Sequence, residues 1–241
     1  MLKLIKKYLT VGTHNLPNRD AWLEKNLQAL PSGTKILDAG AGETKYRKFC
    51  GHLNYTSQDF GQYNGEGNGE GSQTNVWDNS KLDIVSDITK IPVQTASFDA
   101  VLCVEVLEHV PEPINALSEL SRILKPGGKL ILTLPFCSMT HFAPYFFYTG
   151  YSKYWVEKFL PEKGFKIDAI DYNGNYFEYI GQETRRMHRF ISKYYSDSKF
   201  WFVLTKICAL PMIFLLNYLA LKSKKSEEVL CYGLNIVAIR I

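Results

Sequence analysis

The amino-acid sequence predicts an α/β fold built on a parallel, doubly wound sheet. Five short apolar segments follow one another in the first 140 residues, and none of them alternates apolar with polar positions. Uninterrupted apolar strands are typical of sheets that helices cover on both faces. A glycine-rich turn after the first segment and an amphipathic helix before the fifth add the strand–helix–strand order of such a sheet. The expected strands are 35–39, 53–60, 82–86, 98–104 and 129–134.

The clearest helix lies between the fourth and fifth of these strands. Pro111 and Pro113 mark its start, because proline is tolerated in the first helical turn. The sequence KPGG at 125–128 is expected to end it, with glycine as the C-terminal stop. Its apolar residues recur at helical spacing and would face the sheet: Ile114, Leu117, Leu120 and Leu124.

Composition narrows the class of protein. A chain of 241 residues with 46% hydrophobic and 22% charged residues can bury a substantial core and is not disordered as a whole. The net charge of +4 is too mild for a dedicated nucleic-acid binder. The five cysteines form no Cys-x-x-Cys pair, so no metal site is expected and a reducing compartment is favoured. Residues 1–9 form a short basic amphipathic segment without a secretory pattern, so we expect a cytoplasmic protein.

The rest of the chain completes a single domain. Four glycines between residues 61 and 75 alternate with Asn and Glu, which indicates a flexible surface loop. A metal-binding loop is the alternative, but the Asp spacing of an EF-hand is missing. Two further strands are expected at 165–170 and 230–239, and the long segment between them should be structured. The expected parts are a helical extension (1–33), a cofactor-binding core (34–136), a substrate cap with an apolar insertion (137–228) and a final strand (229–241).

The glycine turn after the first strand indicates a nucleotide-like cofactor. Gly40 and Gly42 would let the backbone approach such a ligand. A dinucleotide site prefers a third glycine, but this chain has Lys45 there. Asp38 precedes the turn, where its charge would oppose a pyrophosphate and would suit an ammonium and a sulfonium. The turn therefore favours S-adenosylmethionine over NAD.

Carboxylates also follow the second and third strands. Asp59, with Phe60 beside it, ends the second strand, where it can accept hydrogen bonds from ribose hydroxyls. Asp87 follows the third strand and is placed to bind an adenine amino group, with Ile88 against the ring. Each aspartate alone is explained equally well as a helix cap or turn residue. With Asp38, the three would line one edge of the sheet, and that combination favours a binding site.

Four motifs together resemble those of class I S-adenosylmethionine-dependent methyltransferases. They are ILDAGAG (36–42), DITKIP (87–92), SFDAVLCVEVLEHV (97–110) and LKPGG (124–128), within residues 34–136. The resemblance, which extends to small bacterial enzymes associated with surface glycans, implies a Rossmann-like seven-stranded sheet whose last strand is antiparallel. It also implies a helical insertion before that strand. The family often has a further glycine where this chain has Glu43-Thr44, which leaves the placement of the methionine end open.

Two histidines are candidates for a general base. His109 follows the fourth strand, where a structural role is the alternative. His141 lies past the fifth strand, on the expected acceptor side, and is the stronger candidate for a base or a substrate contact. Glu105 is expected to touch the cofactor. Arg185 and Arg186 could bind an anionic acceptor or form a solvated helix face. An acceptor pocket or an apolar cap is expected from the aromatic residues Phe142, Tyr145, Phe146, Phe147 and Tyr148.

The apolar segment at 200–221 has three possible roles. It could pack as a cap or homodimer face, lie on an anionic membrane surface, or span a membrane. Its longest uncharged run, 207–221, is shorter than the about 20 residues of a spanning helix. The lysines that follow it suit the inner membrane surface: Lys222, Lys224 and Lys225.

The expected activity is methyl transfer to a hydroxyl of a small molecule or a glycan intermediate. If the protein lies on a membrane, the expected acceptor is a sugar hydroxyl on a lipid carrier. The alternatives are a quinone-type lipid, RNA or protein as the acceptor, or binding of S-adenosylmethionine without catalysis. RNA is disfavoured because no RNA-binding module is attached. An NAD-dependent oxidoreductase is disfavoured by Asp38 and Lys45.

Overall fold

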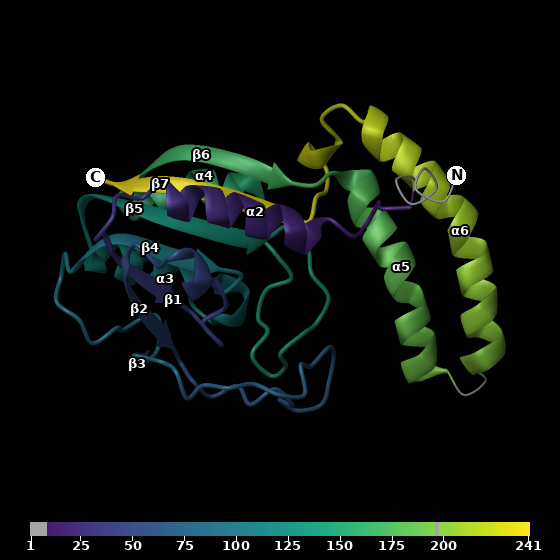
Figure 1. Ribbon diagram of the computed structural model, residues 1–241, viewed down its shortest axis with the longest axis horizontal. Helices are drawn as coiled ribbons and strands as arrows, with labels where there is room; N and C mark the ends of the chain where they lie inside the picture. Colours follow the sequence, from purple (N-terminus) through teal and green to yellow (C-terminus); the bar gives the residue numbers. More distant parts are fainter. Residues whose placement is uncertain (1–8, 196–197) are drawn as a thin grey trace. The chain divides into compact units, whose positions relative to one another are not determined.

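The computed structural model of the protein describes residues 9–195 and 198–241 (Figure 1). Its centre is a seven-stranded sheet with the order β3-β2-β1-β4-β5-β7-β6. The strands from β3 to β5 in this order run parallel, and β7 pairs antiparallel with β5. The predicted fold class is confirmed. The segment 1–9, expected to be amphipathic, lies outside the described residues except for Leu9.

All seven expected strands are present; the first and the fourth have the expected ends, and the ends of the others are shifted. The third is reduced to two residues, and the seventh begins three residues later than expected. The strands are β1 (Lys35–Ala39), β2 (Asn54–Asp59), β3 (Ile84–Val85), β4 (Phe98–Val104), β5 (Leu124–Pro135), β6 (Phe165–Asn173) and β7 (Gly233–Arg240). The helices are α2 (Asn15–Gln28), α3 (Pro113–Ile123), α4 (Lys153–Glu162), α5 (Tyr176–Tyr194) and α6 (Ser198–Lys222), with short 3-10 helices η1 (Lys45–Phe49), η2 (Leu107–His109) and η3 (Ser226–Glu228).

The end of α3 differs from the sequence prediction. The helix stops at Ile123, and Leu124 already has extended backbone and pairs with Phe98. Both Ile123 and Leu124 are fully buried, so core packing drives the chain straight into β5. The glycines at 127–128 therefore lie inside the strand and do not cap the helix. A side chain at Gly128 would lie 2.8 Å from the Lys125 carbonyl oxygen, which explains why glycine is required there.

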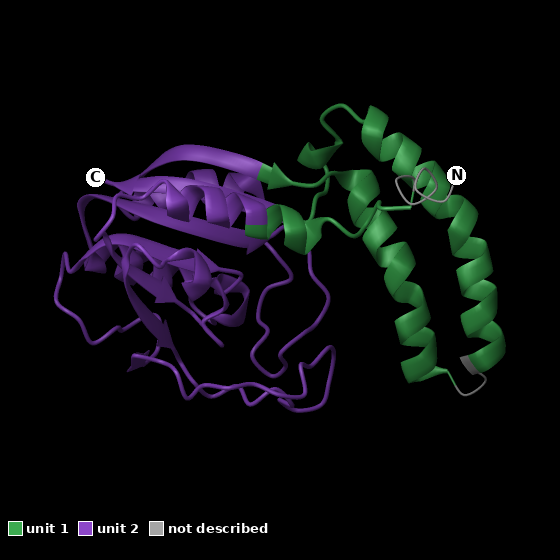
Figure 2. Ribbon diagram, viewed as in Figure 1, with its two compact units in different colours: residues 1–20, 172–232 green, residues 21–171, 233–241 purple. Residues whose placement is uncertain are grey.

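The chain divides into two compact units (Figure 2). The larger comprises residues 21–171 and 233–241 and holds most of the sheet. Its core joins apolar residues of α2, β1, β4 and β5, among them Leu23, Leu27, Ile36, Leu102 and Ile131.

The smaller unit comprises residues 1–20 and 172–232 and contains α5 and α6, which run side by side as a helical hairpin (Figure 1). The expected helical insertion before the last strand is confirmed. Val11 packs with Ile213 and Leu216 of α6. A side chain at Gly12 would lie 2.3 Å from the backbone of α5 at Gln182, so glycine allows the N-terminal segment to lie against that helix.

Candidate functional site

The glycine turn is fastened to the end of β2. The amide groups of Gly40 and Ala41 both donate to the Gln58 carbonyl oxygen, at 2.8 Å. The Gly42 amide donates to Asp59 Oδ2 at 3.0 Å. Both glycines have left-handed backbone, with φ of 79° and 51°. These bonds place the turn at the carboxyl ends of β1 and β2, which is where open α/β sheets bind their ligands.

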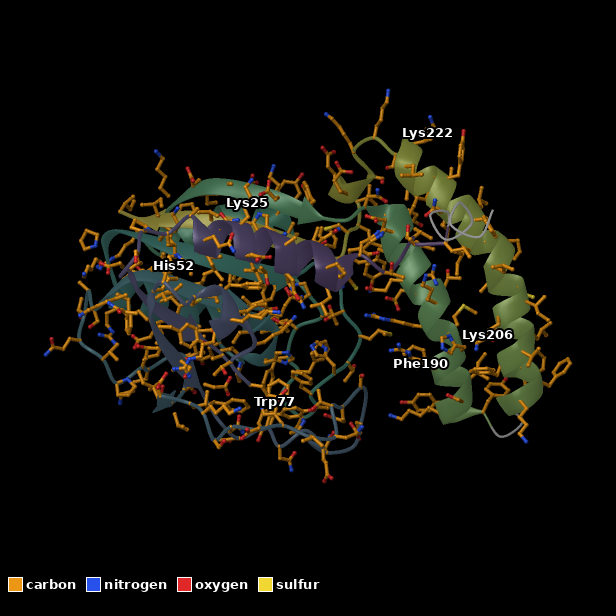
Figure 3. The ribbon with its side chains drawn as sticks, viewed as in Figure 1. Lys25, His52, Trp77, Phe190, Lys206 and Lys222 are labelled. Carbon is orange, nitrogen blue, oxygen red and sulfur yellow. The ribbon has the colours of Figure 1, made fainter. Side chains whose placement is uncertain are left out.

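Neither glycine of the turn has room for a side chain. A Cβ atom at Gly40 would lie 2.4 Å from Val106 Cγ2, and one at Gly42 would lie 2.6 Å from Trp77 Cζ2. Trp77 belongs to the segment between β2 and β3 (Figure 3). Trp77 was not predictable as a site residue, because no local pattern in the sequence indicates which turn a loop tryptophan covers.

Asp38 is buried beneath the turn, although its charge suggested a place beside the ligand. Only 1% of the residue is exposed, and its Oδ2 atom accepts a hydrogen bond of 2.6 Å from the Tyr55 hydroxyl. Burial raises the pKa of Asp38 to about 7, the Tyr55 bond opposes the rise, and the nearby charge of Asp59 adds to it. Asp38 therefore changes charge near neutral pH.

We expect the affinity for S-adenosylmethionine to increase from about pH 5.5 to about pH 7.5. Below its pKa of about 7, Asp38 is mostly neutral. A cationic donor stabilises the carboxylate form, so donor binding releases the Asp38 proton and is weaker at low pH. The affinity should increase by up to about tenfold per pH unit below that pKa. Calorimetry in two buffers of different ionisation enthalpy measures both the affinity and the proton release.

The control for this pH dependence is Asp38→Asn, which should bind the donor with an affinity independent of pH in the same range. His109 does not contribute there, because its pKa is about 4. The other groups facing Asp38 are Tyr55 and Cys50, whose pKa values burial raises far above the range, and Asp59. A pH dependence that survives in Asp38→Asn would contradict the assignment.

Asp59 and Asp87 reach the same edge as Asp38 because β1, β2 and β3 are adjacent and parallel. Asp59 accepts from the Gly42 amide and, through Oδ1, from the Gly61 amide at 2.9 Å. Each oxygen keeps a second lone pair, so ribose contacts remain compatible with this turn-holding role. Asp87 Oδ1 accepts from the Thr89 amide and hydroxyl, both at 2.8 Å, as in a turn. Ile88 is buried.

Glu105 and Phe60 also lie at this edge. Glu105 directly follows β4 with left-handed backbone (φ 52°), and its Oε1 accepts a hydrogen bond from the Thr133 hydroxyl at 2.9 Å. The bond fastens Glu105 to β5. Phe60, just after β2, meets the ring of Tyr145 edge-on at 4.9 Å between centroids. All eight residues predicted to bind the cofactor therefore lie at the carboxyl ends of β1–β4 or in the turns that follow β1–β3. Their contacts with the cofactor remain predictions.

His109 and His141 are neighbours in space. Their ring centroids lie 4.7 Å apart, at nearly perpendicular planes. The Nδ1 atom of His109 is bonded to the Tyr145 carbonyl oxygen at 2.5 Å, and that of His141 to the Met139 carbonyl oxygen at 2.9 Å. A carbonyl only accepts, so both Nδ1 atoms carry the hydrogen and both Nε2 atoms are acceptors in the neutral rings. Burial, helped by His141, lowers the pKa of His109 to about 4, so His109 is neutral at pH 7.

The glycine-rich segment 61–75 is a largely exposed loop between β2 and β3, as the sequence predicts, but it is also tied to another loop. It bonds to the loop that carries His141: Asn68 donates to the Ala143 carbonyl, Ser72 to that of Thr140, and Phe142 to that of Ser72. Added side chains at Gly67 and Gly71 would lie 2.0 Å and 2.6 Å from carbonyl oxygens of that loop. The glycines therefore permit two loops to pack together (Figure 1).

An aromatic cluster joins these loops to the histidines. Tyr63 is buried and stacks on Phe142 at 4.5 Å, and Trp77 meets both rings edge-on at 5.3 Å. Phe142 also stacks on His109 at 5.2 Å. The cluster extends from the glycine turn to the two histidines, so the aromatic group predicted to be an acceptor pocket or an apolar cap also includes Tyr63 and Trp77.

One group of side chains at this site could hold a metal ion. Ligand atoms of Glu108, His109 and His141 lie within 4.8 Å of one another, and Glu108 is buried. Glu108 Oε1 lies 3.7 Å from His109 Nε2. Ligand atoms around tetrahedral zinc are about 3.4 Å apart, so the group would have to contract to bind zinc. The sequence expectation of no metal had not considered this group.

Arg185 and Arg186 of α5 have structural partners. Arg185 donates from Nε to the Val11 carbonyl at 2.7 Å and from its terminal nitrogen to that of Leu9. Arg186 forms an ion pair with Glu183 at 2.9 Å. Arg185 therefore holds the N-terminal segment, and it is neither an exposed anion site nor a solvated residue.

Comparison with known proteins agrees with this geometry. Residues 37–132 match the family described as a methyltransferase domain. Ubiquinone biosynthesis O-methyltransferases from Xanthomonas oryzae pv. oryzae and Xanthomonas campestris pv. campestris are 60% and 52% identical over 40 residues. Those matches span 17% of this chain and 17% of the length of these relatives.

Solved structures share the fold. One is an S-adenosylmethionine-dependent methyltransferase from Mesorhizobium loti. It has a TM-score of 0.50 and 15% identity, and the match covers 90% of this chain and 96% of that one. Phosphoethanolamine N-methyltransferase 2 of Haemonchus contortus, solved with S-adenosyl-L-methionine, has a TM-score of 0.51 and 17% identity over 92% of this chain and 52% of its own. The [4+2]-cyclase SpnF also matches, with a TM-score of 0.52 and 15% identity over 92% of this chain and 80% of its own. At these identities the likeness shows the fold alone.

The fold is that of class I methyltransferases, a class whose cofactor is S-adenosylmethionine. The match to the methyltransferase domain family covers residues 37–132, which is less than half of this chain. The presence of a cyclase among the structural neighbours shows that the activity has to be argued from the site itself.

Proposed function

We propose that this protein transfers the methyl group of S-adenosylmethionine to a hydroxyl of a small molecule or a glycan intermediate. The observation that carries the proposal is the position of His141: its acceptor nitrogen lies beside a neutral His109, at the same sheet edge as the glycine turn. The O-methyltransferase name of the relatives supports an oxygen acceptor. A cytoplasmic location without nucleic-acid partners is part of the proposal.

The residues at the edge fit the donor. Gly40 and Gly42 bring backbone without Cβ atoms to this edge, and Asp59 retains acceptor capacity. Bound S-adenosylmethionine supplies a methyl carbon activated by its sulfonium. The acceptor oxygen forms a bond to that carbon while the sulfur–carbon bond breaks and its electron pair stays on sulfur.

His141 takes the hydroxyl proton at Nε2 in this proposal. Its Nδ1–H bond to the Met139 carbonyl fixes the tautomer that leaves Nε2 as the acceptor. His109 is too weak a base for this at neutral pH, since its pKa is about 4, and it serves to orient its neighbour. The aromatic cluster would limit water at the reacting atoms.

Turnover of methyl-labelled donor by the full chain tests the proposal. The acceptor panel contains small phenols, nucleotide-linked and lipid-linked sugars, quinone-type lipids, RNA, protein and a metabolite extract. We expect label on a hydroxyl of a small molecule or sugar, with one S-adenosylhomocysteine released for each methyl transferred. Label only on RNA, protein or a quinone-type lipid would overturn the acceptor class. Tight donor binding without turnover in any arm would favour the non-catalytic alternative.

A further inference from the structure

The α5–α6 hairpin has an exposed apolar stripe. Seven residues of α6, spaced three or four positions apart, share one face of the helix. Each is between 41% and 70% exposed, although all are large and apolar. We call this set the α6 stripe: Phe200, Val203, Ile207, Leu210, Phe214, Tyr218 and Leu221.

The opposite face of α6 supplies the packing that holds the hairpin. Ile213 and Leu216 are buried with Val11, and Phe177 and Ile180 of α5 pack against them. Asn217 is buried and accepts a hydrogen bond from the Val11 amide at 3.2 Å. The α6 stripe is therefore not part of the core, because a different face of this helix packs there.

The composition of α6 is that of a membrane-contacting helix. Residues Lys199–Lys222 are long and apolar enough to cross a membrane, with a mean hydropathy of 1.8, yet only 17% of that window is buried. A soluble core helix of this composition would be mostly buried. A monomer in water would therefore expose a large apolar surface, which marks an interaction site.

The charge around the α6 stripe indicates which kind of partner it binds. Beyond Arg185 and Arg186, which have partners inside the protein, residues 187–228 contain seven Lys or Arg residues and three acidic residues. Exposed aromatic residues gather where the two helices meet, among them Phe190, Tyr194 and Trp201. Figure 3 shows Phe190 on α5, and Lys206 and Lys222 on α6. Basic and aromatic side chains flanking an apolar stripe are complementary to an anionic lipid surface.

Two other occupants fit less well. A second copy of the chain would bring two strongly basic surfaces together, which opposes association. A spanning helix would bury Lys206, whose ammonium lies 4.2 Å from the Phe202 ring, and the uncharged run 207–221 is shorter than the about 20 residues required. Lying flat, α6 keeps its lysines at the headgroups while the stripe enters the acyl region.

We infer that the α5–α6 hairpin docks this protein on anionic membranes, with the α6 stripe inserted at the lipid interface and the flanking lysines, with Arg189, on the headgroups. The inference does not depend on methyl transfer, because it concerns lipid binding by the smaller unit alone. It assigns a location to the protein and leaves the chemistry of the sheet edge unchanged.

Flotation of the full chain with vesicles tests this docking. We expect at least about tenfold more protein to float with mixed phosphatidylcholine–phosphatidylglycerol vesicles than with phosphatidylcholine alone, and the difference to fall in high salt. Leu210→Glu with Phe214→Glu should abolish flotation. The matched control, Tyr154→Glu with Ile241→Glu, adds two charges at exposed apolar residues of the larger unit and should float normally.

Three results would overturn the docking. The first is equal flotation of the stripe variant and its control, provided that both unfold at the temperature of the unmodified protein. The second is a dimer in light scattering that the stripe variant dissociates, without flotation in any arm. The third is retention in membranes after alkaline carbonate extraction, which would indicate a spanning helix. Each of these readouts is independent of methyl transfer, so failure of the proposed function would leave the test intact.

Discussion

Replacing His141 with asparagine is expected to lower kcat for methyl transfer by about 10²- to 10⁴-fold, the usual contribution of a general base. The asparagine amide can replace Nδ1 as the donor to the Met139 carbonyl, but it has no atom at the position of Nε2. His141→Asn therefore keeps the structural bond and removes the proton acceptor. The measurement is kcat with the acceptor that the labelling experiment identifies, together with the dissociation constant for the donor, which should not change.

A purely structural role for His141 would give a different pattern. His141→Asn would then be nearly as active as the unmodified protein, while His141→Ala would be impaired and less stable. Equal loss of kcat in both variants supports the base. His52→Gln is the matched control, because the His52 ring bonds the Leu30 carbonyl through Nε2, which the glutamine amide can replace, and His52 precedes β2 and so belongs to the opposite edge of the sheet. Its kcat should be unchanged.

The same histidine nitrogens would be occupied if a cation bound to Glu108, His109 and His141. The two roles exclude one another, since a ligating Nε2 cannot accept a proton. We expect dialysis against EDTA to leave methyl transfer unchanged. A loss of about tenfold or more that returned with a divalent cation would assign these side chains to a metal centre and would overturn the base mechanism.

Gly42→Ala is expected to weaken binding of S-adenosylmethionine by at least about tenfold. Left-handed backbone costs a residue with a side chain about 1–2 kcal/mol, and here the added Cβ would also lie 2.6 Å from the Trp77 ring. Either the ring or the turn has to move, and the turn carries the amide that Asp59 accepts. Calorimetry measures the donor dissociation constant, and thermal unfolding measures the stability of the same variant.

Gly33→Ala is the control for Gly42→Ala, because it adds backbone strain without touching the proposed cofactor site. Gly33 has nearly the same left-handed backbone as Gly40, with φ of 80°, but an added Cβ would have no described atom within 4 Å. It should lose about 1–2 kcal/mol of unfolding free energy and bind the donor normally. A donor affinity of Gly42→Ala within twofold of the unmodified protein would show that the turn does not hold the cofactor.

The sheet was predictable because its signals are local. Each strand is a short apolar run, and Gly40 and Gly42 mark the turn by their type alone. Parallel neighbours end at one edge, so placing Asp38, Asp59 and Asp87 together required only the strand order. The buried orientation of Asp38 was not predictable, because it depends on Tyr55 in the neighbouring strand.

The sequence by itself thus determined the sheet, the glycine turn and the edge where a cofactor would bind. Only the tertiary structure decided the pairing of His109 with His141, the packing of the glycine-rich loop and the exposure of α6. These depend on contacts between segments distant in the chain, which no local pattern encodes. The helix α6 shows the reason most clearly. It is apolar almost all round, so its sequence has no polar face to reveal which side is covered, and only its packing against α5 and Val11 leaves the stripe exposed.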